Sequence, residues 1–555
     1  MSKNHIYEQI YQHISNKKIP LCQADFKQPY IISVPGYYYL TENIELSFYP
    51  NKMDVFHKKT SNDKFGFTAG LKINTPYVIL DLNGYSIYQS PQDYCVQRFF
   101  SLIQLNSFPF SKGVGPIPGN TLELKTADYC VIKGGTLGLS SHQAIIGNEN
   151  KYIVIENIGI LDFEVTGIML NNCHHVHLNK ITIGYSIGVE RSVPITPHFS
   201  GLIFIYKLLQ HLLDSLSLTQ VEEELIKGLQ SKIEDMLMHF LKIIYRSTSL
   251  TKIYSSLENL VSSEPACAFL FNESKLTPCN LHGIKITGKN PSVGKFHESL
   301  EPEKGTYSDH IYLDDITIHN LKACITEEAI FTKNGKIIHI AAGVKATISL
   351  VKEAIIQCII KCIITLSENP IIKKEIGTNL DTDIYAYIFE EKAQESMGLL
   401  GSVDTMGHVN KGVLGIRIGQ SSNAHLNNIK IKHIENIGKN LTDNDRAKLK
   451  TRWNVPKIET LSTNFLEPIN YPGAFAIGLI VSGSKGLCLY NIETSKILSP
   501  SGCAIGMAIN NICEDIKINN FKINRLESCS KCFDSATIVI DEQSKNVSIT
   551  NLTVN

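Results

Sequence analysis

Apolar and polar residues alternate along several short stretches of this chain, and each stretch is interrupted at nearly the same point. In "GIRIGQSSNAHLNNIKIKHI", residues 415–434, one alternating segment ends at a small polar cluster, and a second is interrupted by paired asparagines. Related phrases begin at residues 167, 478, 506 and 537. Alternation with a period of two predicts short β-strands that each bury one face.

The spacing of these phrases predicts a solenoid. The residue that interrupts the second strand returns after 29 residues between Asn491 and Asn520, and after 31 residues between Asn520 and Asn551. From Asn428 to Asn491 the interval is 63 residues, which corresponds to one coil plus an insertion or to two coils. A single coil cannot bury its apolar face, so coils must stack. Ordinary β-hairpins are the alternative, but hairpins do not require this common phase.

The recurring asparagines have a structural role in this interpretation. Asn tolerates left-handed backbone geometry at a turn, and its amide can bond the turn of the next coil. In variant coils we expect Gly283 and Asp315 to take the same place. The predicted ladder of stacked turn residues consists of Asn157, Asn428, Asn491, Asn520 and Asn551.

The chain resembles the right-handed parallel β-helix, or pectin-lyase-like, superfamily. "IISVPGYYYLTENIEL" from Ile31, followed by "NTPYVILDLNGYSI" from Asn74, is similar to the first coils of many such proteins. The resemblance covers about residues 30–200, 265–340 and 410–555. It implies an all-β solenoid, and it leaves the activity open because this fold hosts lyases, hydrolases, adhesins and phage tailspikes.

Other segments depart from the solenoid pattern. Residues 1–30 predict a helical cap over the open end of the first coil, because Ile6, Tyr7, Ile10 and Ile14 fall on one helical face. Residues 31–555 form the predicted β-helix. It is interrupted by helical insertions at 204–262 and 341–407, with helices predicted over 219–245 and 341–366, and by a polar loop at 439–472. The uncharged stretches are too short to span a bilayer.

Composition restricts the function classes. The 53 basic residues equal the 53 acidic ones, and zero net charge argues against a nucleic-acid-binding protein. The abundance of Ile, Asn and Lys, with a single Trp, resembles proteins of AT-rich genomes, including giant amoeba-infecting viruses. The first residues lack the apolar core of a signal peptide. We therefore expect an intracellular protein, or one in a virus particle assembled in the host cytoplasm.

Two clusters could carry chemistry. "DHIYLDDITIH" contains carboxylates near a turn, which could bind calcium through oxygen ligands or could replace the ladder asparagine. "CHHVHLN" contains neighbouring histidines, which could bind a metal or could face solvent. The candidate metal ligands are Asp314, Asp315, His174 and His177. Calcium is the one cofactor that we consider.

The resemblance also raises the prospect of an enzyme. β-Helical hydrolases use paired carboxylates, and their family pattern runs N-x-D, D-D, G-H-G and R-x-K. Here the order is reversed, because Asp314-Asp315 precedes "NLD" at 379–381, and Arg417 lacks the accompanying lysine. The candidate catalytic residues are Asp314, Asp315, His310 and Arg417.

We favour a non-enzymatic scaffold, as a surface or particle component with glycans as candidate contacts. The reason is that successive coils lack a visible set of acid, base and aromatic residues. The alternative is a polysaccharide lyase or glycoside hydrolase with a non-standard site. Candidate partners are a second copy or an assembly partner, bound through the helical insertions or through the C-terminal coil, whose strand edges would be open.

Overall fold

The computed structural model describes residues 2–48, 68–96, 100–109, 124–186, 220–247, 281–288, 307–323, 331–333, 336–338, 412–436, 474–500, 502–510, 512–528 and 535–555, with isolated positions between 210 and 259. The predicted insertion at 341–407 and the predicted loop at 439–472 lie outside these residues.

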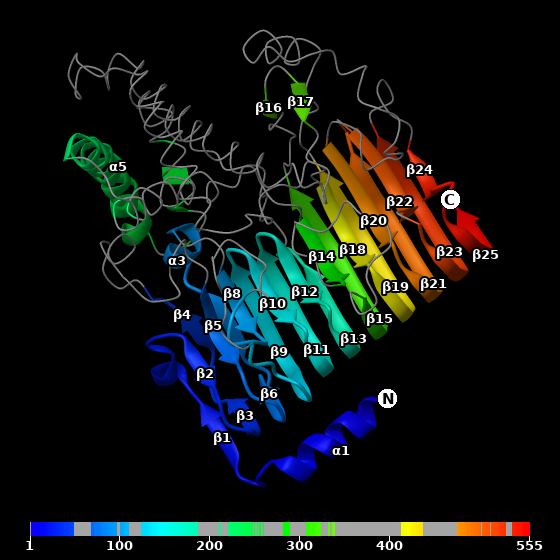
Figure 1. Ribbon diagram of the computed structural model, residues 1–555, viewed down its shortest axis with the longest axis horizontal. Helices are drawn as coiled ribbons and strands as arrows, with labels where there is room; N and C mark the ends of the chain where they lie inside the picture. The colour runs from blue at the N-terminus through cyan, green and yellow to red at the C-terminus, as the bar shows by residue number, and fades with distance from the viewer. Residues whose placement is uncertain are drawn as a thin grey trace.

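Two long parallel sheets run along the molecule, and the coils follow one another from the N-terminal to the C-terminal end (Figure 1). Sheet A contains, in spatial order, β1 (Lys18–Leu21), β3 (Gly36–Leu40), β6 (Val78–Asp81), β9 (Cys130–Ser140), β11 (Lys151–Phe163), β13 (His174–Gly184), β15 (Ser308–Ala323), β19 (Ser421–Asn436), β21 (Lys485–Ser499), β23 (Glu514–Ser528) and β25 (Lys545–Val554). Beside this path, β4 (Ile44–Leu46) pairs with β7 (Ser86–Gln89), which pairs with β9.

Sheet B has the same arrangement. In spatial order it contains β2 (Tyr30–Ile32), β5 (Thr68–Ile73), β8 (Phe100–Gln104), β10 (Gln143–Asn148), β12 (Thr166–Asn171), β14 (Leu281–Thr287), β18 (Gly412–Gly419), β20 (Ala474–Ser482), β22 (Gly502–Asn510) and β24 (Ala536–Ile540). From β10 onward the described long strands alternate along the chain between the two sheets, so the chain winds as a solenoid. The predicted parallel β-helix is thereby confirmed.

The alternating pattern places every second side chain of sheet A in the interior. Val176 pairs in register with Ile311, and Leu487 pairs with Ile516. All four side chains are fully buried, and they belong to one core that extends through the coils. Val547 of the last coil packs against this core and is partly buried. The strands therefore bury one face each, as the alternation predicted.

A column of glycines lets sheet B pack closely against neighbouring elements. Gly167, Gly283, Gly415, Gly478 and Gly506 follow one another on successive strands, and a Cβ atom at Gly283 would lie 2.7 Å from the carbonyl oxygen of Gly415. The expectation that Gly283 belongs to the turn ladder is wrong. It lies within β14 of sheet B. The local sequence pattern around Gly283 fits either strand of a coil, and the close approach of the neighbouring backbone explains the glycine at this position.

The longest interruptions of the solenoid fall at the turn from sheet A to the next strand of sheet B. They are residues 185–280 between β13 and β14, 324–411 between β15 and β18, and 437–473 between β19 and β20. The first contains α5 (Gln220–Arg246), which confirms the helix expected over 219–245. Within the second, β16 (Phe331–Lys333) pairs antiparallel with β17 (Lys336–Ile338). Among the described residues, no helix combines the length and apolarity needed to cross a membrane.

The N-terminal helix is present, but it does not cover the end of the first coil. α1 (Lys3–His13) lies on the outer face of sheet A, where Ile6 and Ile10 are fully buried. They pack against four outward side chains on four successive strands, which are Tyr37, Ile79, Val131 and Val154. This outer apolar column gives Ile6 and Ile10 a surface to pack against. The core of the first coil instead includes Phe26, in the 3₁₀ helix η1 (Gln23–Phe26).

The C-terminal coil carries exposed apolar side chains. Leu552 and Val554 of β25 are 46% and 57% exposed, and Ile540 of β24 is 41% exposed. In sheets A and B respectively, β25 and β24 are the last strands of the described order. Self-association through this coil stays a prediction.

The glycine column provides a test of the packing. A Cβ atom at Gly415 would lie 2.4 Å from the carbonyl oxygen of Gly478 and 2.7 Å from Cγ2 of Ile431. We expect Gly415→Ala to lower the free energy of unfolding by about 1–3 kcal/mol, because overpacking must shift backbone atoms. Denaturant titration followed by circular dichroism measures the change. Gly138→Ala is the control, since its nearest neighbour would be 3.8 Å away. Equal stability of the two variants would contradict the close packing.

Candidate functional site

The predicted ladder residues lie at left-handed turns of sheet A. Asn428, Asn491, Asn520 and Asn551 have φ values of 53°, 53°, 60° and 57°. The interval between Asn428 and Asn491 is one coil plus an insertion, because β19 pairs directly with β21. Asn520 Nδ2 donates to Asn491 Oδ1 over 2.8 Å. The first predicted ladder residue along the chain, Asn157, also has a positive φ of 52°.

Asp315 takes the ladder position in β15, with φ 55°. Its Oδ1 accepts a hydrogen bond of 3.2 Å from Asn428 Nδ2. One hydrogen bond of the ladder joins positions that are not equivalent, because Asn491 Nδ2 donates to Asn427 Oδ1 at 3.2 Å rather than to Asn428. The carboxylate of Asp315 therefore acts here as an acceptor for the amide of the following coil.

A row of polar side chains runs directly beside the ladder on the outer face of sheet A. We call it the polar row. Its members pair in register from β6 to β25 and are Asp81, Lys133, Glu156, Asn179, Asp314, Asn427, Tyr490, Asn519 and Thr550. Asp314 lies in the middle and accepts hydrogen bonds from Asn179 Nδ2 at 3.2 Å and Asn427 Nδ2 at 2.8 Å. Both carboxylate oxygens of Asp314 are thus bonded by amides of the adjacent coils.

A three-ring stack lies two residues before the polar row, on the same outer face. The rings of His177 and Tyr312 are 4.7 Å apart and nearly parallel, and those of Tyr312 and His425 are 5.3 Å apart at 4°. Val176 and Leu178 are buried, so His177 faces outward, and the register places Tyr312 and His425 in the same column. In the next coil the position belongs to Cys488, which is paired with His425.

A six-ring stack lies at the corner where the strands of sheet A begin. Centroid distances between neighbouring rings range from 3.9 to 5.2 Å, and the members are His13, Tyr77, Tyr129, Tyr152, His175 and His310. All except His13 have left-handed backbone conformations. Aromatic rings therefore gather on successive coils, which is one part of the combined set of acid, base and aromatic residues that the sequence did not show.

His310 is held by a carboxylate. Its Nδ1 is 2.5 Å from Asp309 Oδ2. Asp309 Oδ1 accepts bonds from Ser422 Oγ at 2.8 Å and Asn423 Nδ2 at 2.9 Å. Burial raises the pKa of Asp309, but the bonds from Asn423 and Ser422 and the contact with His310 outweigh it and leave this pKa below its usual value. An oriented, partly exposed imidazole is suited to hydrogen bonding or to proton transfer.

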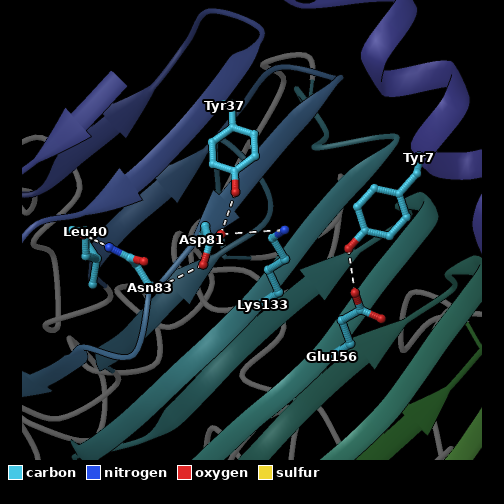
Figure 2. Close-up of polar contacts among 7 residues, drawn as sticks. All are labelled: Tyr7, Tyr37, Leu40, Asp81, Asn83, Lys133 and Glu156. Carbon is cyan, nitrogen blue, oxygen red and sulfur yellow. Dashed lines mark hydrogen bonds and ion pairs between the residues drawn. The ribbon is translucent and has the colours of Figure 1, made fainter. Parts of the chain in front are cut away.

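Helix α1 is fastened to the polar row at Glu156 (Figure 2). Lys3 Nζ lies 2.7 Å from Glu156 Oε2, and Tyr7 donates its hydroxyl proton to Oε1 over 2.6 Å. We call these two contacts the α1 clasp. Burial raises the pKa of Glu156, but the bonds from Lys3 and Tyr7 outweigh this effect and lower the pKa overall. The pKa of Tyr7 is raised, first by burial and then by Glu156.

Beside the clasp, Asp81 is bound from its own coil and its neighbours. Tyr37 donates its hydroxyl proton to Asp81 Oδ2 over 2.5 Å, and Lys133 Nζ lies 3.6 Å from the same oxygen. Asp81 Oδ1 accepts a bond from the backbone N–H of Asn83. Figure 2 shows Asp81, Lys133 and Glu156 on adjacent strands, with the tyrosine hydroxyls directed at the two carboxylates.

The structure brings most of the sequence-predicted site residues onto sheet A, but it does not assemble them into one centre. Arg417 lies on β18 of sheet B, where burial lowers its pKa, and it is separate from His310, Asp314 and Asp315 of β15. His174 pairs with Asp309, and burial lowers its pKa. In the part of the chain that the structure describes, no group of three or more His, Cys, Asp or Glu residues could hold a metal ion.

Known proteins resemble this chain only at a low level. No protein-family model and no curated protein matches the chain. One similar solved structure is a tailspike protein mutant of E. coli bacteriophage HK620 in complex with a hexasaccharide, with 7% identity and a TM-score of 0.24 over 94% of this chain. Another is the catalytic domain of a GH87 alpha-1,3-glucanase in complex with nigerose, with 9% identity and a TM-score of 0.16 over 99% of this chain. The matches span 61% and 66% of those chains.

The ladder can be tested at Asn520. We expect Asn520→Leu to lower the free energy of unfolding by about 1–3 kcal/mol, because leucine is strained at a positive φ and loses the amide bond to Asn491. Asn520→Gly is the matched control, since glycine accepts this conformation and loses only the bond. Thermal and denaturant unfolding measure both. If Asn520→Leu lowers the free energy of unfolding no more than Asn520→Gly does, the left-handed conformation is not the reason for asparagine at this position.

The lowered pKa of Asp309 predicts that the stability of the fold depends on pH. Its pKa is lowered in the folded protein, so its ionised form stabilises the fold above the ordinary Asp pKa of about 3.9. This contribution is lost as the pH falls through the lowered folded-state value. We therefore expect the stability difference between wild type and Asp309→Asn to be largest near neutral pH and to shrink below about pH 4. Urea titrations across this range measure it, and a constant difference would refute the assignment.

Proposed function

We propose that this protein is a non-enzymatic β-helical scaffold that contacts carbohydrate chains through the outer face of sheet A. The observation that carries the proposal is the polar row beside the three-ring stack on consecutive coils. Amides and carboxylates supply the donors and acceptors that sugar hydroxyls need. Aromatic rings supply flat surfaces for the apolar faces of sugars.

The periodicity of the surface supports a polymeric ligand. Coils repeat at the strand spacing of about 4.8 Å, which is comparable with the length of one sugar residue. Asn179, Asp314 and Asn427 therefore offer similar groups at similar intervals along the axis. A chain with its own repeat, lying parallel to the axis, would meet equivalent contacts on each coil.

The last ring of the three-ring stack, His425, is placed to bind a sugar. Inside the stack, each ring face is covered by the next ring. His425 is exposed, and the next coil places the smaller side chain of Cys488 beside it. A sugar could therefore stack on the outer face of the His425 ring while its hydroxyls bond the adjacent Asn427 in the polar row.

The bonding of the carboxylates favours binding over catalysis. Both oxygens of Asp314 accept amide hydrogen bonds, and Asp315 accepts one from Asn428. Carboxylate oxygens that accept hydrogen bonds from neighbouring amides form a fixed polar surface, as a binding face requires. Calcium binding at these residues stays a prediction, as does a role in a virus particle.

Binding to soluble polysaccharides tests the proposal. We expect dextran, mannan or another neutral polysaccharide to bind the full chain in affinity electrophoresis. Tyr312→Ala and Asn427→Ala should each weaken this binding by roughly tenfold, as expected for about 1.4 kcal/mol. Ser548→Ala is the control, because Ser548 lies on the same face at β25, beyond the rings. If all three variants bind like wild type, the surface is not the contact site.

The second candidate is a polysaccharide lyase or hydrolase, and the pair formed by Asp309 and His310 favours it. A carboxylate that orients an imidazole is a common arrangement for general acid–base catalysis. Incubating the protein with the same polysaccharides and analysing the products distinguishes the two functions. Release of reducing ends or unsaturated products by wild type, and its loss in His310→Asn, would establish the enzyme and overturn the scaffold proposal.

A further inference from the structure

We propose that the surface beneath α1 is a second carbohydrate-binding stretch, and that α1 occupies it as a displaceable internal ligand. The ligand class rests on the function proposed above. The occupied stretch consists of Asp81, Lys133 and Glu156, which continue the polar row without a break from Asn179.

The contacts of α1 are of the kind that a sugar chain would make. The Tyr7 hydroxyl bonds Glu156 as a sugar hydroxyl would, and Lys3 bonds the second oxygen of the same carboxylate. The ring of Tyr7 lies near Lys133, with 5.9 Å between Nζ and the ring centroid. Tyr37, also near Lys133, offers a ring within the stretch itself. Thus α1 presents hydroxyl, ammonium and apolar groups to the same row of side chains that remains uncovered farther along the sheet.

Helix α1 is attached through a small number of side chains. It has 11 residues, and only Ile6 and Ile10 are fully buried. Helices of this length are marginal in water without a packing surface. Elements with few buried apolar contacts open more readily than the core to which they are attached. The clasp at Glu156 holds α1 in place together with the packing of Ile6 and Ile10 and the stacking of His13 on Tyr77.

Charge selects a neutral ligand. Lys133 is paired with Asp81 and also attracts Glu156, and the departure of Lys3 removes the ion pair of Glu156. The uncovered stretch then carries two carboxylates and one lysine. Such a surface repels the carboxylates of an acidic polysaccharide and accepts hydrogen bonds from the hydroxyls of a neutral one.

A zero-length crosslink reports whether α1 is displaced. Carbodiimide treatment should join Lys3 to Glu156, because their side-chain atoms are 2.7 Å apart. We expect dextran or mannan to reduce the yield of this crosslink several-fold in mass spectrometry, and polygalacturonate to leave it unchanged. The crosslink between Lys227 and Glu223 of α5 is the internal control, since it lies outside sheet A. A Lys3–Glu156 yield that no neutral polysaccharide changes would overturn the proposal.

Clasp variants provide an independent measurement. Lys3→Ala with Tyr7→Phe should raise the affinity for the neutral polysaccharide several-fold and speed amide hydrogen exchange in α1. Lys17→Ala, outside the clasp and exposed, should change neither. Faster exchange without a gain in affinity would show that α1 is a structural cover only. Circular dichroism confirms that the variants fold.

The two proposals fail in different ways. If Tyr312→Ala abolishes binding while the crosslink and the clasp variants have no effect, the proposed function stands and this inference is wrong. If only the clasp variant binds and Glu156→Gln in that background abolishes the binding, the stretch beneath α1 is the contact site and the uncovered face is not. Absence of binding in every variant overturns both.

Discussion

In-register parallel pairing of each coil on the next is the constraint on which the rest of this structure depends. It converts a position in the coil into a column along the molecule, so equivalent side chains of successive coils lie next to one another. Inward columns are filled by Ile, Leu and Val, and one column of sheet B holds glycine because the neighbouring backbone lies too close for a Cβ atom. Turn columns hold residues with positive φ, which are asparagine in several coils and aromatic at the start of sheet A.

Alternation was sufficient to predict the inward columns and the left-handed turns, because both depend on local geometry. It was insufficient where the outer face is also apolar. Val78, Ile79 and Leu80 are consecutive apolar residues, and so are Cys130, Val131 and Ile132. Such runs indicate a strand covered on both faces, and the cover here is α1. The helical pattern of α1 showed which of its residues are buried, but it could not show what buries them.

The ring stacks could have been found from a local signal. Tyr or His immediately precedes the first inward residue in "YVIL", "YCVI", "YIVI", "HVHL" and "HIYL", which belong to five successive coils. The intervals between these rings differ widely because of the insertions, so a search at constant period misses them. Pairings such as Tyr312 with His425 also depend on which strands become neighbours across long interruptions, and no local pattern determines that.

The outer face of sheet A changes character along the axis while its polar row continues. In one column the outward residues are Ile79, Val131 and Val154 beneath α1, and then His177, Tyr312 and His425 beyond it. The apolar side chains there pack against α1, whereas the imidazole and phenol rings beyond it stack on one another and leave their edges to solvent. The same register that builds the core thus divides one continuous face into a covered part and an open part. The boundary lies between β11 and β13, where the apolar column gives way to His177.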